Sequence, residues 1–132
     1  MQRKPILCLD FDGVIHSYTS GWKGATNIPD PPVPGALLFM YHAINSGWDV
    51  VVHSSRARHI FGPLAMRRWL KKHAGNLWNE TPLGPGLEDV LFVRLKPSAM
   101  VTIDDRALNF TGSWPDLGEL KAFKPWNKRE SK

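Results

Sequence analysis

Residues 6–13 read Ile-Leu-Cys-Leu-Asp-Phe-Asp-Gly, an apolar run of four that stops at an acidic residue. Four consecutive apolar residues without alternation are typical of a strand buried on both faces, as in a parallel sheet. In such sheets the ligand site lies just outside the carboxyl ends of the strands. The stretch therefore predicts an α/β protein with Asp10 and Asp12 at its site.

The rest of the chain continues this pattern of short apolar runs and helical segments. Further strands are expected at 50–53, 91–93 and 99–103, and helices at about 35–45 and 60–73. The order strand, helix, strand, helix, strand, strand predicts a single Rossmann-like α/β domain with a mainly parallel central sheet flanked by helices.

Two stretches fall outside this pattern. Residues 13–34 are rich in Gly and Pro and follow no helical or strand period, which predicts a flap-like loop. This segment is too short to fold as a cap domain, because a piece of that size buries little core. Residues 121–132 form a basic C-terminal tail, so the domain is expected to span residues 1–120.

The composition is that of a globular protein, with 132 residues, 42% hydrophobic and 22% charged. Five basic residues and one acidic residue fall within 121–132, which gives this stretch +4 of the net charge of +5. A nucleic-acid partner is compatible with that charge but does not follow from it. No apolar run reaches the roughly 20 residues of a membrane-spanning helix, so no membrane partner is expected. The single cysteine, Cys8, fits a reducing cytoplasm, and the oligomeric state is not predicted.

Polar side chains follow all the predicted strands, and they are Asp10, Asp12, Ser54, Lys96, Asp104 and Asp105. Carboxylates crowded into one crevice repel one another unless a cation lies between them, and hard oxygen ligands suit Mg²⁺. A hydroxyl and an ammonium group would bind phosphate oxygens, and a carboxylate can attack phosphorus. The set predicts a magnesium-dependent phosphomonoesterase with a phosphorylated substrate.

Four short motifs resemble those of the haloacid dehalogenase superfamily. In the family's order they are Leu9–Val14, Val52–Arg56, Lys96–Pro97 and Val101–Arg106, within residues 6 to about 106. The resemblance implies that Asp10 is the nucleophile and a magnesium ligand. It implies that Asp12 is the general acid and base, with its backbone carbonyl on the metal. Asp104 would complete the metal site.

The resemblance also implies that Ser54 and Lys96 bind the phosphoryl group, with Lys96 paired to Asp10. Ser55 is the alternative to Ser54, which we prefer because the family often shows a hydroxyl, any residue and an arginine here. Asp105 would be a metal ligand through water or an orienting partner, and a turn residue is the other interpretation.

Several further residues have two interpretations each. His16 lies in the flap close behind the expected nucleophile and contacts either substrate or the core. Arg56 and Arg106 either bind a second anionic group or form structural salt bridges. Trp22 either stacks on a nucleobase or covers the core.

The second aspartate and the missing cap narrow the chemistry. Family members that remove halides lack this aspartate, so the resemblance favours a small capless phosphatase. A capless site excludes water poorly from a small substrate, which favours a phosphorylated polymer such as a nucleic-acid end or a phosphoprotein. The alternatives are a nucleotide or small-metabolite phosphatase whose lid comes from a neighbouring subunit, and a non-catalytic binding module.

Overall fold

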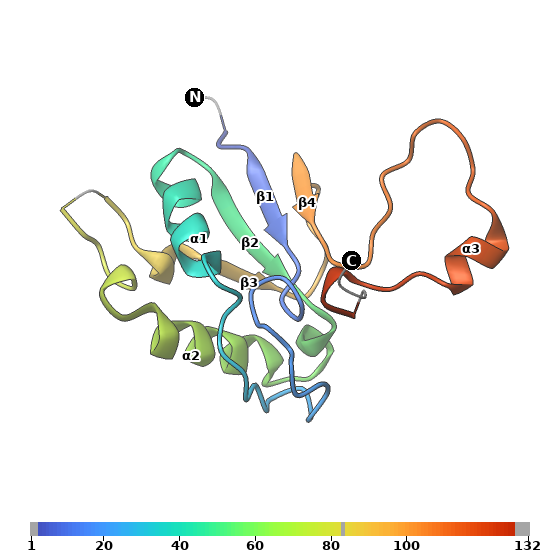
Figure 1. The fold of residues 1–132 in the computed structure, drawn as a ribbon. Coiled ribbons are helices and arrows are strands. Elements are labelled where there is room, and N and C mark those ends of the chain that lie inside the picture. Colours follow the sequence, from blue (N-terminus) through green and yellow to red (C-terminus); the bar gives the residue numbers. More distant parts are fainter. Residues whose placement is uncertain (1–2, 83, 129–132) are drawn as a thin grey trace.

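The computed structural model describes residues 3–82 and 84–128. Its sheet contains four strands, β1 (Ile6–Leu9), β2 (Asp49–His53), β3 (Leu91–Val93) and β4 (Val101–Ile103). The strands are all parallel and lie in the order β3-β2-β1-β4 (Figure 1). This confirms the α/β fold expected for a single small domain. The first and last strands of the chain are neighbours, so β1 contacts both β2 and β4.

The register of β1 with its two neighbours, β2 and β4, sets the position of the site. Leu9 of β1 lies opposite Val52 of β2 and Ile103 of β4, so these strands end at the same level. The backbone N–H of Asp10 continues this pairing and donates to the carbonyl of Ile103 at 3.0 Å. The residues that follow the strands therefore meet at one edge of the sheet.

Two helices cover one face of the sheet, α1 (Ala36–Asn45) and α2 (Gly62–Ala74). Both pack in the same core with strand side chains that include Leu7, Leu9, Val50 and Val52. Because successive side chains of a strand alternate between faces, these four point to the same side, and Figure 1 shows both helices there. Helix α2 starts two residues later than expected, because Ser55–Arg58 forms a separate 3-10 turn after β2.

The opposite face receives the connection between β3 and β4, residues 94–100, in which the described chain forms no helix. Cys8 alternates with Leu7 and Leu9 and therefore points to this face. Burial raises the pKa of the free Cys8 thiol, while the nearby charge of Lys96 opposes the rise. The connection thus passes close to β1 on the face that α1 and α2 leave open.

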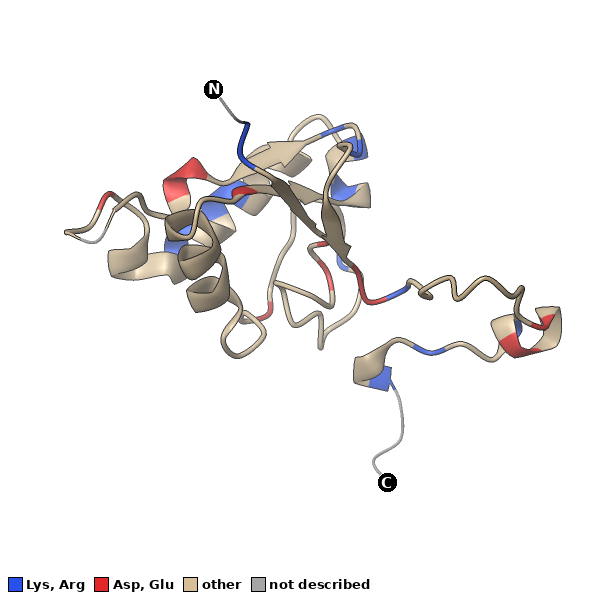
Figure 2. Cartoon of the chain, turned by 90° about the horizontal axis from the view of Figure 1, so that it is seen from above, with Lys and Arg blue, Asp and Glu red and all other residues tan. Residues whose placement is uncertain are grey.

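Beyond β4 the chain leaves the sheet as an arm, residues 107–125, which extends away from the body in both views (Figures 1 and 2). It carries the short helix α3 (Leu117–Lys121), close to the single turn expected around 115–120. Its apolar side chains are exposed, among them Leu108, Phe110, Trp114 and Leu117. Among the described residues, no helix combines the length and apolar composition needed to cross a membrane.

The chain returns from the arm to the body just before its end. The indole N–H of Trp126 donates to the carbonyl of Gly13 at 2.8 Å, at the start of the flap. Residues 129–132 of the basic tail lie outside the described residues. The basic tail therefore contacts the body through Trp126, next to the loop that follows β1.

Candidate functional site

A hollow of about 280 Å³ opens at the carboxyl ends of β1 and β2, beside the residues that follow β4. We call it the acidic hollow, and it is lined by Asp10, Asp12, Tyr18, Trp22, Ser54, Ser55, Asp105 and Arg106. The structure thus brings together residues from three strand ends and from the flap. Five of the expected site residues meet here: Asp10, Asp12, Ser54, Ser55 and Asp105.

Three carboxylates lie close together at this edge. Asp10, Asp104 and Asp105 each offer an oxygen atom, and these atoms all lie within 4.8 Å of one another. The Asp10 carboxylate accepts from the N–H of Phe11, and that of Asp104 from the N–H of Arg106, both at 2.9 Å. Figure 2 shows acidic residues where the last strand passes into the arm, with a basic residue directly after them. We call the three residues the carboxylate trio.

The electrostatics of the trio favour a bound cation. Burial raises the pKa of Asp10 to about 7, and a hydrogen bond with Asp105 and the charges of Asp104 and Asp105 add to the rise. A hydrogen bond between two carboxyl groups requires a proton on one of them. One oxygen of Asp105, Oδ1, is buried with no hydrogen-bond partner among the described residues. Clustered oxygens with an unsatisfied lone pair fit a hard divalent cation such as Mg²⁺.

Gly13 makes the close approach of Asp105 possible. Its φ of +84° lies in the left-handed region, which favours glycine. A Cβ atom at this position would lie 2.3 Å from Oδ2 of Asp105, far inside van der Waals contact. The glycine of the first motif is therefore needed both for its backbone conformation and for the space that Asp105 occupies.

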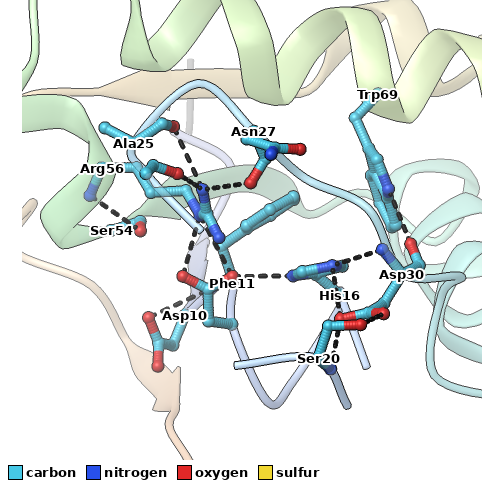
Figure 3. A network of polar contacts seen from close by, with 12 residues as sticks. Asp10, Phe11, His16, Ser20, Ala25, Asn27, Asp30, Ser54, Arg56 and Trp69 are labelled. Carbon is cyan, nitrogen blue, oxygen red and sulfur yellow. Dashed lines mark hydrogen bonds and ion pairs between the residues drawn. The ribbon is translucent and has the colours of Figure 1, made fainter. Parts of the chain in front are cut away.

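The Asp12 side chain contacts Arg56 and His16, two residues of the polar network in Figure 3. The Nε–H of Arg56 donates to both carboxylate oxygens of Asp12, at 3.1 and 2.9 Å, and Nδ1 of His16 lies 2.8 Å from Oδ1. Burial alone would raise the pKa of Asp12, but the hydrogen bonds from His16 and Arg56 and their charges outweigh it and lower the pKa. The expectation that the backbone carbonyl of Asp12 binds the metal stays a prediction. The trio includes Asp105, which the sequence suggested as a ligand through water or an orienting partner.

His16 and Arg56 are both fully buried, so they support the site from behind. The backbone N–H of Asp30 donates to Nε2 of His16 at 3.1 Å, so the proton of the neutral ring is on Nδ1 and points to Asp12. The Nη1 group of Arg56 donates to the carbonyls of Gly24, Ala25 and Asn27. Arg56 therefore takes the structural role of its two interpretations, tying the flap to Asp12.

Of the residues expected to bind phosphate, the serines line the hollow, whereas Lys96 lies elsewhere. Ser54 is buried, and its hydroxyl oxygen accepts from the N–H of Arg56 at 3.2 Å, while Ser55 is exposed. Both serines line the acidic hollow, so both interpretations of the second motif remain. Lys96 is exposed in the β3–β4 connection and is not among the described residues that line the hollow. Its role in phosphate binding stays a prediction.

Two residues near the site, Tyr18 and Trp126, were not predicted from the sequence. Tyr18 lines the hollow from within the flap, where no period relates it to β1. Trp126 reaches Gly13 from a stretch whose lysines indicate solvent exposure. An isolated tryptophan among cations was the one hint that part of the tail packs.

The fold and the hollow together define an α/β protein with an acidic site at the carboxyl ends of parallel strands. Comparisons with protein-family models, with curated proteins and with solved structures found no match. The function therefore has to be inferred from the site itself.

Proposed function

We propose that this protein is a magnesium-dependent phosphomonoesterase of the haloacid dehalogenase type, with Asp10 as the nucleophile. The observation that carries the proposal is the meeting of the carboxylate trio with Ser54 and Ser55 at one hollow. Carboxylates and hydroxyls are the groups that a divalent cation and a phosphoryl group require together. The four motifs that resemble this superfamily supply the residues concerned.

The reaction would proceed in two displacements on phosphorus. A carboxylate oxygen of Asp10 forms a bond to phosphorus as the bond to the leaving oxygen breaks, which gives an aspartyl-phosphate, and the leaving oxygen takes a proton from solvent water. Water then attacks phosphorus, Asp12 takes its proton, and the Asp10 carboxylate is released with inorganic phosphate. The contacts of Asp12 with Arg56 and His16 keep it ionised, as the base in this second step.

The remaining residues would stabilise the negative charge of the phosphoryl group. The trio would bind Mg²⁺, which neutralises negative charge on the transferring group when bound. The hydroxyls of Ser54 and Ser55 would donate to phosphoryl oxygens, and the superfamily resemblance assigns Lys96 a similar role. The flap between β1 and α1 forms no second domain in the described chain, which favours a phosphorylated polymer end as substrate. The buried free cysteine suits a cytoplasmic protein.

The test is hydrolysis of p-nitrophenyl phosphate with and without Mg²⁺. Asp10→Asn should abolish turnover, because the amide is nearly isosteric but cannot act as an anionic nucleophile. Asp49→Asn is the matched control, since it makes the same change at an exposed residue at the amino end of β2. A wild-type rate in Asp10→Asn would overturn the aspartyl-phosphate mechanism.

The second candidate is a non-catalytic binding module with the same fold. The observation in its favour is that Lys96 does not line the hollow with the other expected residues in the described chain. Binding of Mg²⁺ and phosphate without turnover of any phosphate ester would select this candidate. Lys96→Ala, which should lower the rate by orders of magnitude in an active enzyme, separates the two further.

A further inference from the structure

The acidic hollow has an aromatic wall that the phosphatase chemistry does not use. Tyr18 and Trp22 both come from the flap and line the hollow with residues that follow the strands. Trp22 is 53% exposed, which is unusual for the largest apolar side chain. A phosphoryl group needs carboxylates and hydrogen-bond donors, so two aromatic rings serve some other part of the ligand.

Trp22 is held in place although it is exposed. The guanidinium of Arg56 lies 4.8 Å from the centre of a Trp22 ring, in a cation–π contact. Arg56 is itself fixed, because it donates hydrogen bonds to the carboxylate of Asp12 and to the flap carbonyls of Gly24 and Ala25. An indole that is immobilised beforehand loses little entropy when a second ring stacks on it. Trp22 is therefore a preformed stacking surface.

Tyr18 is kept at the hollow at a cost in backbone energy. Its φ is +61°, and no other residue apart from glycine has a positive φ in the described chain. An aromatic residue in the left-handed region is strained, and such strain persists where the surroundings enforce it, commonly at ligand sites. Here the flap enforces it, with a hydrogen bond from the N–H of Gly21 to the Tyr18 carbonyl at 3.1 Å.

The rim of the hollow also carries an unpaired cation. Arg106 is exposed and follows the carboxylate trio, and the described residues offer its guanidinium no hydrogen bond or ion pair. Its position is fixed because its backbone N–H donates to Asp104. A ligand bound through one phosphate and one ring would meet this cation with its next anionic group.

We propose that the site binds the phosphorylated terminal nucleotide of a single-stranded nucleic acid, with the base on Trp22 and Tyr18 and the next phosphate on Arg106. The proposal rests on the proposed function, because the terminal phosphate occupies the site of Asp10 and Ser54. Base stacking on aromatic side chains with a cation on the backbone is the usual way to bind single strands. A nucleic acid supplies a second phosphate next to every base, so one chain can meet the aromatic rings and Arg106 together.

The first experiment compares adenosine 5′-monophosphate with ribose 5-phosphate, which contain the same ester bond and differ in the base. We expect kcat/KM to be at least about tenfold higher for the nucleotide, from one stacked base. Trp22→Ala should remove this preference by lowering kcat/KM for the nucleotide far more than kcat/KM for ribose 5-phosphate, and Trp22→Phe should restore it. Trp114→Ala is the control, since Trp114 is 86% exposed on the arm. Equal kcat/KM for the two substrates in the wild type would overturn the proposal.

The second experiment uses a 5′-phosphorylated dinucleotide. Its kcat/KM should exceed that of the mononucleotide and fall more steeply with salt, and Arg106→Gln should remove both differences. Arg58→Gln, at an exposed position on the 3-10 turn, should leave them in place. A phosphotyrosyl peptide hydrolysed faster than either nucleotide would replace the nucleic acid with a phosphoprotein.

A binding measurement separates this proposal from the proposed function. The dissociation constants of adenosine 5′-monophosphate and ribose 5-phosphate are measured on the Asp10→Asn variant with Mg²⁺ present. Tighter binding of the nucleotide, together with no turnover by the wild type, would support the aromatic wall and overturn the phosphatase. Turnover of p-nitrophenyl phosphate without any preference for the base would do the reverse.

Discussion

Asp10 is the residue whose charge most affects stability, because burial, Asp105 and Asp104 raise its pKa from 3.8 to about 7. In the metal-free folded protein Asp10 keeps its proton over a pH range in which the unfolded chain releases it. The contribution of Asp10 to the free energy of unfolding should therefore be fully present below pH 4 and be lost as the pH rises to about 7, by up to about 1.4 kcal/mol per pH unit.

Urea unfolding at pH 5 and pH 8 in EDTA measures this dependence. Asp10→Asn should flatten it and should stabilise the metal-free protein at pH 8, while Asp49→Asn keeps the wild-type slope. Mg²⁺ should stabilise the wild type more at pH 8 than at pH 5, since the cation competes with the proton. Equal slopes for wild type and Asp10→Asn would show that Asp10 does not carry the shared proton.

Gly13 offers a second prediction for a single residue. Gly13→Ala combines an unfavourable φ with a Cβ atom that would lie 2.3 Å from Asp105. Gly35→Ala is the matched control, because Gly35 has a φ of +82° and open space around its Cβ position. We expect Gly13→Ala to weaken Mg²⁺ binding at least tenfold by isothermal titration calorimetry. Gly35→Ala should lower the melting temperature without weakening Mg²⁺ binding.

At the level of elements, Arg56 fastens the flap to the body. It pairs with Asp12 and donates to three flap carbonyls, and it is fully buried. Arg56→Ala leaves the carboxylate of Asp12 without its cation, and breaking a buried pair in this way costs about 3–5 kcal/mol. We expect a large drop in melting temperature and proteolytic cleavage within 19–29, whereas Arg58→Ala should leave both unchanged. Wild-type resistance to protease in Arg56→Ala would mean that the flap is held by other contacts.

The sequence predicted all four strands from short apolar runs, including β3 and β4, whose side chains are half-buried or exposed. Strands β1 and β3 have the expected bounds, and the flap is a loop as its glycines and prolines indicated. Strand β4 is shorter than expected because Ala99 and Met100 belong to the connection on the open face of the sheet. The residues that line the hollow from strand ends followed from the fold, whereas Tyr18 and the contacts of Arg56 depend on the path of the flap. No periodicity describes that path.

The site, like the fold, was predicted from the sequence only in part. Asp10 and Asp104 follow paired strands, so register alone brings them together. Which side chains Asp12 contacts depends on Arg56, which is 44 residues away in the chain, and on the path of the flap that carries His16. Spacing along the sequence does not contain that information.

On the scale of the whole molecule, the C-terminal tail brings both charge and a contact to the site. A chain ending at residue 120 loses the cations of 121–132 and the Trp126 hydrogen bond, while Trp126→Phe loses the hydrogen bond alone. The truncation should flatten the salt dependence of KM for a phosphorylated oligonucleotide. Trp126→Phe should keep that dependence and lower the rates on oligonucleotide and p-nitrophenyl phosphate alike, by severalfold. The measurement is a salt titration of KM for the full-length, truncated and Trp126→Phe proteins. Identical slopes for the full-length and truncated chains would show that the tail does not take part in recognition.

The pairing of β1 with β4 also has a consequence for the order in which the protein folds. Strands β1, β2 and β3 are linked through α1 and α2, whereas β4 reaches β1 only after nearly the whole chain has been made. Contacts between distant segments are slow to form because a long loop must close first. Asp104 and Asp105 follow this strand, so a growing chain that has not reached β4 cannot bring the carboxylate trio together. The cation site that we propose would form only once β4 has paired with β1.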